Sequence, residues 1–358
     1  MRVCILGSGL SALTLAKVLV DQNISVDTFC SKKKPSSNFS RTIGISKSNI
    51  DFYNANIVNI EKLCWKINKI EILTENLNQE KVLNFENNGN QLFSVVKNFK
   101  IYEAVEKSLS KNKNYKKIYK KNYFNLLKKY DLIINTDYSN SITKKFFNKK
   151  IIKDYNSCAC ISTIMHKKII NHTATQIFTK YGPLAFLPVS DTQTSLVFSI
   201  KNYKNITNQN LIELVNKYNF KYDINEIEKF YFFNLISLNL RNYYQGNILA
   251  FGDLLHKIHP LAGQGFNMTI RDIKILQDII KYKINLGLPL DISVNKEFEK
   301  NSKAKNIIFS NGINLVNELF NFESKTKNDI LSKSVQFIGK NNSINKMFTK
   351  IADNGLIF

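Results

Sequence analysis

The sequence lacks the clustered side chains that hold metal ions. The four histidines, spread from His166 to His259, show neither a His-Glu-x-x-His pattern nor a carboxylate partner. The cysteines form no Cys-x-x-Cys pair and follow no secretory signal, so we expect buried, reduced thiols in a cytosolic protein. They are Cys4, Cys30, Cys64, Cys158 and Cys160. We therefore expect no bound metal.

Acidic residues are also scarce, since 28 Asp and Glu face 51 Lys and Arg and leave a formal net charge of +23. Such an excess can indicate nucleic acid or an anionic membrane surface as a partner. The lysines are spread along the whole chain without a nucleic-acid-binding motif, so we expect no nucleic acid partner and a secondary role at membranes. No apolar run approaches the roughly 18 residues of a membrane span. We expect a cytoplasmic protein, with any contact to the inner membrane being peripheral.

The glycines that are present fall into two patterns with a chemical meaning. The first opens the chain, where the apolar run Arg2–Leu6 is followed by Gly7-Ser8-Gly9-Leu10-Ser11-Ala12 and a helical pattern over Leu13–Leu19. Strand, glycine turn and helix in this order form a dinucleotide-binding fingerprint. The glycines permit a tight turn and close approach of a pyrophosphate, and Ala12 permits close packing of helix on strand.

The second pattern lies in Ile248–Asp272. An apolar strand over Ile248–Phe251 leads to Gly252-Asp253, a loop closed by Pro260, and Gly263-Gln264-Gly265 at the start of a helix near Phe266. A glycine-rich helix start offers unpaired backbone N–H groups to an anion. Asp253, at the carboxyl end of a strand, is placed to accept hydrogen bonds from sugar hydroxyls.

The remaining chain predicts mostly secondary structure. Alternating residues predict hairpin strands over Ile57–Leu92 and a β-rich region from Ile151 onward, and periodicity predicts a helix over Leu211–Tyr218. Two lysine-rich amphipathic helices, Glu297–Phe322 and Ile330–Ile351, either cover the core, the commoner use, or lie on a membrane. Three local expectations are a solvent-side Asp27, a structural Arg271–Asp272 ion pair, and a loop histidine, His259, with its hydrogen bonds satisfied.

Several segments carry a resemblance to a known family. Gly252-Asp253 followed by His259-Pro260-Leu261-Ala262-Gly263-Gln264-Gly265-Phe266-Asn267 resembles the second FAD-binding motif of the aromatic-ring hydroxylases, and more narrowly that of the ubiquinone-biosynthesis hydroxylases. Arg41-Thr42-Ile43-Gly44-Ile45-Ser46 and the Gly-Pro-Leu-Ala-Phe-Leu-Pro string at 182–188 are similar to segments of the same family.

This resemblance implies a site that binds FAD. Asp253 would hold the ribityl or ribose region, the Gly263–Asn267 backbone would follow the pyrimidine edge of the flavin, and Arg41 would lie near the flavin. The cofactor-binding residues are then Gly7, Gly9, Leu10, Ser11, Ala12, Arg41, Asp137, Asp253, Pro260, Gly263, Gln264, Gly265, Phe266 and Asn267. Substrate-pocket candidates are Pro183, Ala185, Leu187, His259 and Pro260.

The implied fold is α/β of the para-hydroxybenzoate hydroxylase type. A discontinuous, Rossmann-like FAD domain would comprise residues 1–65, 94–150 and 245–300. A β-rich substrate domain would comprise 66–93 and 151–244, and C-terminal helices would occupy 301–358.

Two positions depart from the family. Cys30 stands where a glutamate usually ends the second strand and binds the adenosine ribose, which predicts weaker FAD retention, partly offset by Lys32–Lys34. Tyr138 replaces the glycine of an Asp-Gly pair linked to both FAD and NAD(P)H, while Asp137 matches. A tyrosine cannot reproduce a positive φ without strain.

The resemblance implies a monooxygenase in which NAD(P)H reduces FAD, dioxygen adds to form a C4a-hydroperoxide, and oxygen passes to the ring of a polyprenylated phenol of ubiquinone biosynthesis. A membrane surface or a quinone-biosynthesis complex are its further partners. Two alternatives stay open: a degenerate FAD-binding accessory protein of such a complex, and another flavoenzyme of the same fold, such as a prenyl reductase. A halogenase is disfavoured because Trp65, the only tryptophan, lacks the context of that signature.

Overall fold

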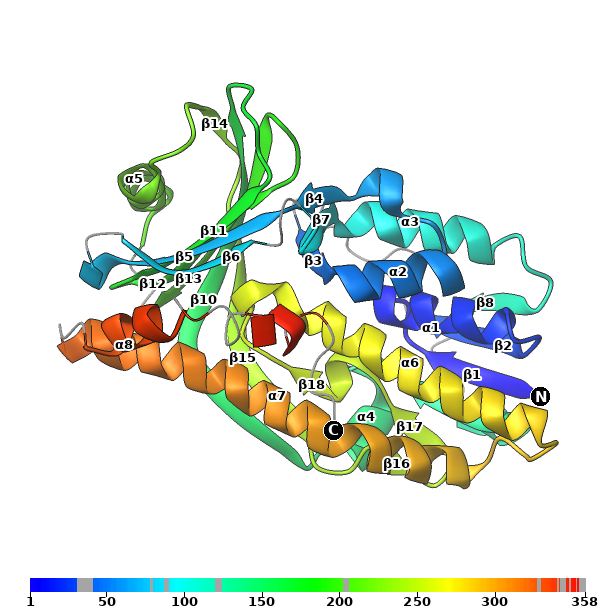
Figure 1. The fold of residues 1–358 in the computed structure, drawn as a ribbon. Helices are drawn as coiled ribbons and strands as arrows, with labels where there is room; N and C mark the ends of the chain where they lie inside the picture. The colour runs from blue at the N-terminus through cyan, green and yellow to red at the C-terminus, as the bar shows by residue number, and fades with distance from the viewer. Residues whose placement is uncertain are drawn as a thin grey trace.

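The fold is seen in a computed structural model, which describes residues 1–30, 41–77, 80–86, 90–119, 124–201, 206–326 and 330–339, with 341, 346–347, 349–351 and 353 (Figure 1). Lys32–Lys34 lie outside the described residues. Helices and sheets are mixed along the chain, as the predicted fold class requires. The helices are α1 (Leu10–Val20), α2 (Lys47–Asn56), α3 (Asn98–Leu109), α4 (Ser141–Phe146), α5 (Asn208–Tyr218), α6 (Gln264–Asn285), α7 (Ile292–Thr326) and α8 (Ile330–Gly339).

A mainly parallel sheet carries the N-terminal strand near its centre. Its order is β16-β17-β9-β1-β2-β8, and only β16 pairs in antiparallel fashion. The inner strands are short, continuously apolar and buried, as expected for parallel strands covered on both faces. The strands are β1 (Arg2–Leu6), β2 (Ser25–Cys30), β8 (Tyr115–Tyr119), β9 (Leu132–Asn135), β16 (Tyr244–Gln245) and β17 (Ile248–Ala250).

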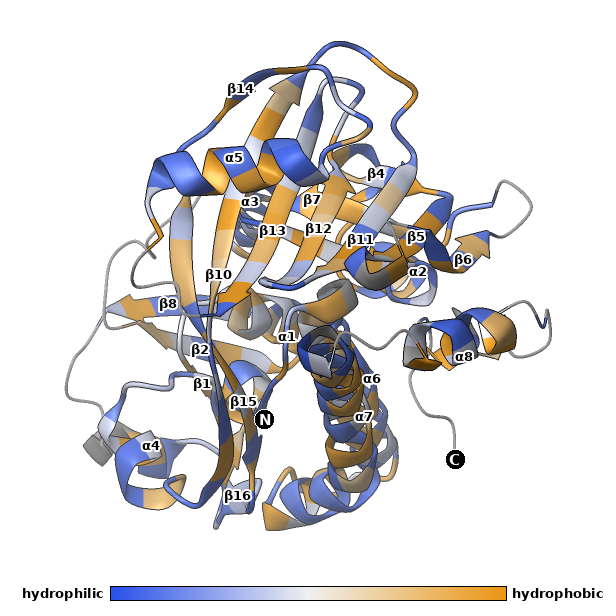
Figure 2. Cartoon of the chain, turned by 90° about the vertical axis from the view of Figure 1, so that its left-hand side faces the viewer, coloured by the Kyte–Doolittle hydropathy of each residue, from blue (hydrophilic) through white to orange (hydrophobic). Residues whose placement is uncertain are grey.

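A larger, mostly antiparallel sheet forms the other half of the molecule. Its order is β18-β15-β10-β13-β12-β11-β5-β6, with β14 paired to β10. Helix α5 lies across one face and buries Leu211, Val215 and Tyr218 there (Figure 2). The strands are β5 (Lys69–Thr74), β6 (Lys81–Glu86), β10 (Lys150–His166), β11 (Thr173–Thr179), β12 (Gly182–Pro188), β13 (Gln193–Lys201), β14 (Ile224–Ile227), β15 (Tyr231–Leu240) and β18 (His256–Lys257).

A small third sheet joins the two large ones. Strand β7 (Phe93–Lys97) pairs with both β3 (Thr42–Ser46) and β4 (Trp65–Ile67). From β3, the Thr42 hydroxyl donates a hydrogen bond to Ser195 Oγ of β13 at 2.8 Å. Further along β3, Gly44 packs against the backbone of Gly263, just before α6. This strand therefore fixes the large sheet relative to the start of α6.

Some expectations about individual elements were wrong. Asp27 is not on the solvent side but 3% exposed, because Arg2 and the Tyr130 hydroxyl both donate hydrogen bonds to it. Helix α7 is longer than predicted and runs across residue 300, whereas α8 ends at Gly339 rather than near Ile351. In the described part of the chain, no helix is long and apolar enough to span a bilayer.

Candidate functional site

The first glycine motif occupies the turn between β1 and α1. Gly7 has φ +123°, its N–H donates to Phe29 O at 3.0 Å, and an added Cβ would lie 2.2 Å from Thr136 Oγ1. The fold itself therefore requires glycine at this position. Gly9 is different: its φ is −75°, and an added Cβ would meet nothing within 4 Å in the described part of the chain.

The second motif shows the same division of roles at the start of α6. Gly263 adopts a left-handed φ of +63°, and its Cα faces Gly44, so the turn needs glycine. Gly265 lies inside the first helical turn, and an added Cβ would meet no described atom within 4 Å. Among the residues that the structure describes, no side chain caps the first turn of either α1 or α6. Gly9 and Gly265 thus leave open space beside uncapped helix starts.

Asn267 holds the start of α6 to its neighbours. Its side-chain oxygen accepts hydrogen bonds from Ser46 N and Asn49 Nδ2, both at 3.0 Å. Its Nδ2 donates to Gly44 O at 3.0 Å and Gly263 O at 3.3 Å. Asn267 is 1% exposed, and three of these bonds are buried, while the bond to Gly263 O is part-buried. A single amide therefore connects β3, α2 and α6.

The two motifs lie side by side. Helix α1 packs against α6, and a Cβ added to Gly252 would lie 3.1 Å from the Ser11 side chain. The ring of Phe266 lies 6.5 Å from that of Tyr53, whose hydroxyl shares a 3.0 Å hydrogen bond with Thr14 of α1. Next to Gly252, the Asp253 side chain is exposed at the carboxyl end of β17. Of the first motif, Ser11 meets Gly252 here, while Leu10 is partly buried and Ala12 is buried.

At the carboxyl end of β2, the position of the family's glutamate holds a buried thiol. Burial raises the pKa of Cys30, and the Lys117 ammonium and a hydrogen bond from Ser8 act in the opposite direction. Ser8 belongs to the first glycine motif, so Cys30 does end its strand beside that motif. A neutral thiol cannot accept two hydrogen bonds from ribose hydroxyls as a carboxylate can.

Two further predicted residues lie at the edges of this region. The Asp137 carboxylate accepts hydrogen bonds from Ser139 N at 2.8 Å and Oγ at 2.7 Å, in a turn next to Gly7. Tyr138 does not have a positive φ, so the strain expected of a tyrosine here is absent. Its ring lies under two ammonium groups, those of Lys150 at 4.0 Å and Lys257 at 4.6 Å. Arg41 immediately precedes β3, with its side chain exposed.

The predicted substrate wall lies on the face of the large sheet opposite α5. Strand alternation puts Leu184 and Phe186 among the residues buried under α5, so Pro183, Ala185 and Leu187 point to the other face. Ala185 and Leu187 keep partial exposure although β12 is an interior strand. Leu187 pairs with Ser195, the partner of Thr42, so this face is directed at β3.

His259 is buried and incompletely hydrogen-bonded. Only 2% of it is exposed, and Nδ1 has no partner among the described residues. Burial lowers its pKa to about 4, so the ring is neutral at pH 7. The Tyr155 ring meets it edge-on at 5.0 Å. The expectation of a satisfied loop histidine was wrong. The neighbouring Gln264 Oε1 is likewise buried without a described partner.

Sequence reasoning missed several contributors to this region. Asn49 and Tyr155 come from segments distant in sequence, and no local pattern marks them, whereas Ser46 ends the segment Arg41–Ser46 already noted for its resemblance. The Arg271–Asp272 ion pair was wrong. Asp272 instead pairs with His256 Nε2 at 2.6 Å and accepts from Asn306 at 3.0 Å, whereas the Arg271 guanidinium lies over the Phe309 ring. No group of metal-ligating side chains occurs among the described residues.

Comparison with known proteins gives relatives in sequence. No family model matches the chain. The 3-demethoxyubiquinol 3-hydroxylase of Escherichia coli K12 is 31% identical over 156 residues, which cover 39% of this chain and 38% of the relative. The ubiquinone biosynthesis monooxygenase COQ6 of Caenorhabditis elegans is 26% identical over 195 residues, or 42% of this chain and 43% of the relative. The matches thus span less than half the length of these relatives.

Solved structures extend the likeness to nearly the whole chain. The p-nitrophenol 4-monooxygenase PnpA of Pseudomonas putida DLL-E4 superposes with a TM-score of 0.80 at 11% identity, covering 99% of this chain and 98% of its own. HpxO of Klebsiella pneumoniae, solved with FAD and uric acid, gives a TM-score of 0.75 at 11% identity, covering 99% and 97%. The predicted fold class and the resemblance to FAD-dependent aromatic hydroxylases are confirmed.

Proposed function

We propose that this protein is an FAD-dependent monooxygenase that hydroxylates the aromatic ring of a polyprenylated phenol in ubiquinone biosynthesis. One observation carries the proposal. Gly9 and Gly265 are glycines that neither backbone conformation nor packing requires, and both leave open space beside uncapped helix starts. Such space lets a ligand approach the main chain closely, and a helix start favours an anion. The names of the relatives in sequence point to the same pathway.

The residues around these glycines fit FAD. Gly7, Gly9, Leu10, Ser11 and Ala12 would surround the pyrophosphate. Asp253 offers an exposed carboxylate to the sugar hydroxyls beside Ser11. At the flavin, Gly263, Gln264, Gly265, Phe266 and Asn267 would follow the pyrimidine edge, and the helix start would favour its negative charge on reduction. Arg41, Asp137 and Pro260 complete the proposed set.

Bound FAD, reduced by NAD(P)H, would supply dioxygen activation, and the protein would orient the phenol and exclude water. Pro183, Ala185 and Leu187 would form an apolar wall of the substrate pocket. His259 and Pro260, from the loop before α6, would line the same pocket. The neutral imidazole of His259 has a buried acceptor or donor nitrogen without a described partner, which a phenol hydroxyl would satisfy.

The division of the chain remains part of the proposal. Residues 1–65, 94–150 and 245–300 would bind FAD, residues 66–93 and 151–244 would bind substrate, and residues 301–358 would cover both. A polyprenyl tail would require entry near a membrane surface or from a quinone-biosynthesis complex. The basic chain favours contact with an anionic surface.

A second candidate is a degenerate FAD-binding accessory protein of a quinone-biosynthesis complex. Cys30 favours it, because the strand end that usually supplies a ribose-binding carboxylate holds a buried thiol instead. The accessory protein would bind FAD weakly and would not couple NAD(P)H oxidation to a phenol.

The first experiment measures FAD binding by fluorescence titration of the purified protein. We expect Gly9→Val and Gly265→Val each to weaken FAD binding at least tenfold while thermal unfolding stays close to that of the parent. Gly312→Val is the matched control, since Gly312 also has open space around it but lies in α7. Unchanged FAD affinity in both site variants would remove the proposed site.

The second experiment separates the two candidates. NAD(P)H oxidation is followed with and without a prenylated phenol, and the product is analysed by mass spectrometry. Faster NAD(P)H oxidation in the presence of the phenol, together with a product that carries one added oxygen atom, supports the hydroxylase. FAD binding without any response to the phenol supports the accessory protein.

A further inference from the structure

The outer surface of α7 carries an apolar stripe. Ile308, Leu315 and Phe322 are 49%, 55% and 68% exposed. They follow one another at intervals of seven residues, or nearly two helical turns, and therefore lie on one side of the helix. Leu319, between the last two, is also exposed. This spacing is that of a packed helix face, yet the described chain does not bury it.

The inner side of α7 carries polar side chains beside buried apolar ones such as Phe298 and Phe320. Asn306 donates to Asp272 at 3.0 Å, Ser310 accepts from Asn239 at 3.0 Å, and Asn314 donates to Ser237 at 3.2 Å. A helix on the surface of a globular protein normally turns its apolar side inward and its polar side to water. Helix α7 buries Phe320 against Phe178 and yet leaves the apolar stripe on its outer side as well. Exposed apolar surface of this kind marks an interaction site.

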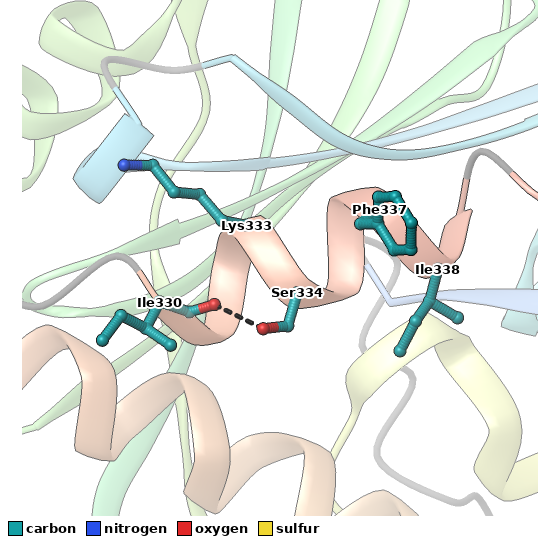
Figure 3. Close-up of a pocket in the computed structure, with 5 residues that line it drawn as sticks. All are labelled: Ile330, Lys333, Ser334, Phe337 and Ile338. Carbon is teal, nitrogen blue, oxygen red and sulfur yellow. Dashed lines mark hydrogen bonds between the residues drawn. The ribbon is translucent and has the colours of Figure 1, made fainter.

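Helix α8 follows α7 and also exposes apolar side chains. Ser332 N donates to the buried Glu323 of α7 at 2.7 Å, which fixes the turn between the two helices. Ile330 and Phe337 are 65% and 79% exposed, again seven residues apart. With Lys333, Ser334 and Ile338 they line an open hollow of about 450 Å³ (Figure 3). Helix α8 lies at the end of the molecule opposite the N-terminus (Figure 1).

The charges around this surface are mainly positive. Lys325, near the end of α7, and Lys333, on α8, are both exposed. The nearby acids are engaged, since Glu318 pairs with Lys153, and Glu323 binds Ser332. Lysine side chains can extend from an apolar surface to anionic lipid headgroups. A second copy of this chain would bring the same positive charge and be repelled.

We propose that the stripe Ile308, Leu315, Phe322 together with Ile330 and Phe337, here called the α7–α8 face, docks on an anionic lipid membrane. Apolar side chains would enter the headgroup boundary while the lysines contact anionic lipids, as in interfacial helices. The inference deepens the proposed function and rests on it in one respect, because a polyprenylated substrate would reside in such a membrane.

The test is co-sedimentation of the full-length protein with phosphatidylcholine vesicles that contain or lack phosphatidylglycerol. We expect binding to the anionic vesicles, and at least a tenfold loss for the double variant Phe322→Ser, Phe337→Ser. Lys325→Glu should weaken binding and its salt dependence. The matched control is Ile170→Ser, Phe220→Ser, because these residues are 89% and 55% exposed outside the face. The control should bind as the parent does.

Three results would overturn the proposal: no binding of the parent to anionic vesicles, equal binding of the double variant, or a change of oligomeric state in the double variant without loss of vesicle binding. FAD affinity and thermal unfolding are measured on the same samples to verify folding. If the double variant loses vesicle binding but still binds FAD, the effect belongs to the α7–α8 face and not to the FAD site. A parent that binds vesicles but not FAD would contradict only the proposed function.

Discussion

The two ends of the proposed FAD site differ in how firmly the chain itself holds them. At the flavin end, the buried Asn267 amide binds β3, α2 and the backbone before α6 through four hydrogen bonds. At the adenosine end, Gly7 fits tightly against Thr136, but the carboxyl end of β2 presents the thiol of Cys30. At the flavin end, polar side chains connect separate segments of the chain. At the adenosine end, the segments are held together mainly by close backbone packing.

This difference indicates where stability and affinity reside. Loss of the Asn267 hydrogen bonds at the flavin end should alter the fold and FAD binding together, because these bonds also join separate segments. Changes at the strand end near Cys30 should alter affinity alone.

Replacing Asn267 with alanine should have the largest effect. Ser46 N–H and Gly44 C=O would remain buried without partners, which costs about 3–5 kcal/mol of unfolding free energy. Urea denaturation measures this loss of unfolding free energy, and we expect FAD affinity to fall in parallel. Asn301→Ala on the exposed side of α7 is the control and should change stability by less than about 0.5 kcal/mol. A stable Asn267→Ala protein would disprove the special role of the flavin end.

Acid should destabilise the flavin end through His259. Its pKa is about 4 in the fold and 6.5 in the unfolded chain, so the unfolded chain binds more protons between these values. The contribution of neutral His259 to the free energy of unfolding is therefore complete above pH 6.5. It is lost as the pH falls toward 4, and the loss amounts to about 3 kcal/mol. Unfolding free energies measured across this range should show a smaller slope for His259→Gln. A parental slope in His259→Gln would contradict this assignment.

Gly7→Ala should destabilise the adenosine end by about 2 kcal/mol, because alanine would take a φ of +123° and contact Thr136 Oγ1. Gly9→Ala should leave thermal unfolding almost unchanged, since its φ is ordinary and space is free. The pair separates a glycine needed by the fold from one kept for a ligand. Equal destabilisation by both changes would contradict that separation.

Cys30→Glu should have the smallest effect, on binding only. A carboxylate at the end of β2, with Lys117 near enough to offset its charge, should tighten FAD binding about tenfold. Cys30→Gln matches the size without the charge and should give a smaller gain. Fluorescence titration measures both, and an unchanged dissociation constant for Cys30→Glu would show that this position does not face the ribose.

Much of the architecture could be predicted because its signals are local. The glycines of both motifs, the apolar strands and the 182–188 string all lie in continuous segments whose order predicts strand, turn and helix. Asp27 could not be placed in this way, because its burial depends on Arg2 and on Tyr130, more than a hundred residues away. The partners of Asp272 and the anchoring of Asn267 are long-range for the same reason. Strand alternation identified the faces of β12, but not which face α5 would cover.

The arrangement of the parallel sheet has a consequence for biosynthesis. Strand β1 is bordered by β2 and β9, and β9 in turn pairs with β17, which begins at Ile248. A nascent chain leaving the ribosome therefore carries its first strands with an open edge until most of the protein has been translated. Such an edge is prone to aggregate. We expect synthesis in the cell to depend on chaperones that shield the amino-terminal half until β17 arrives.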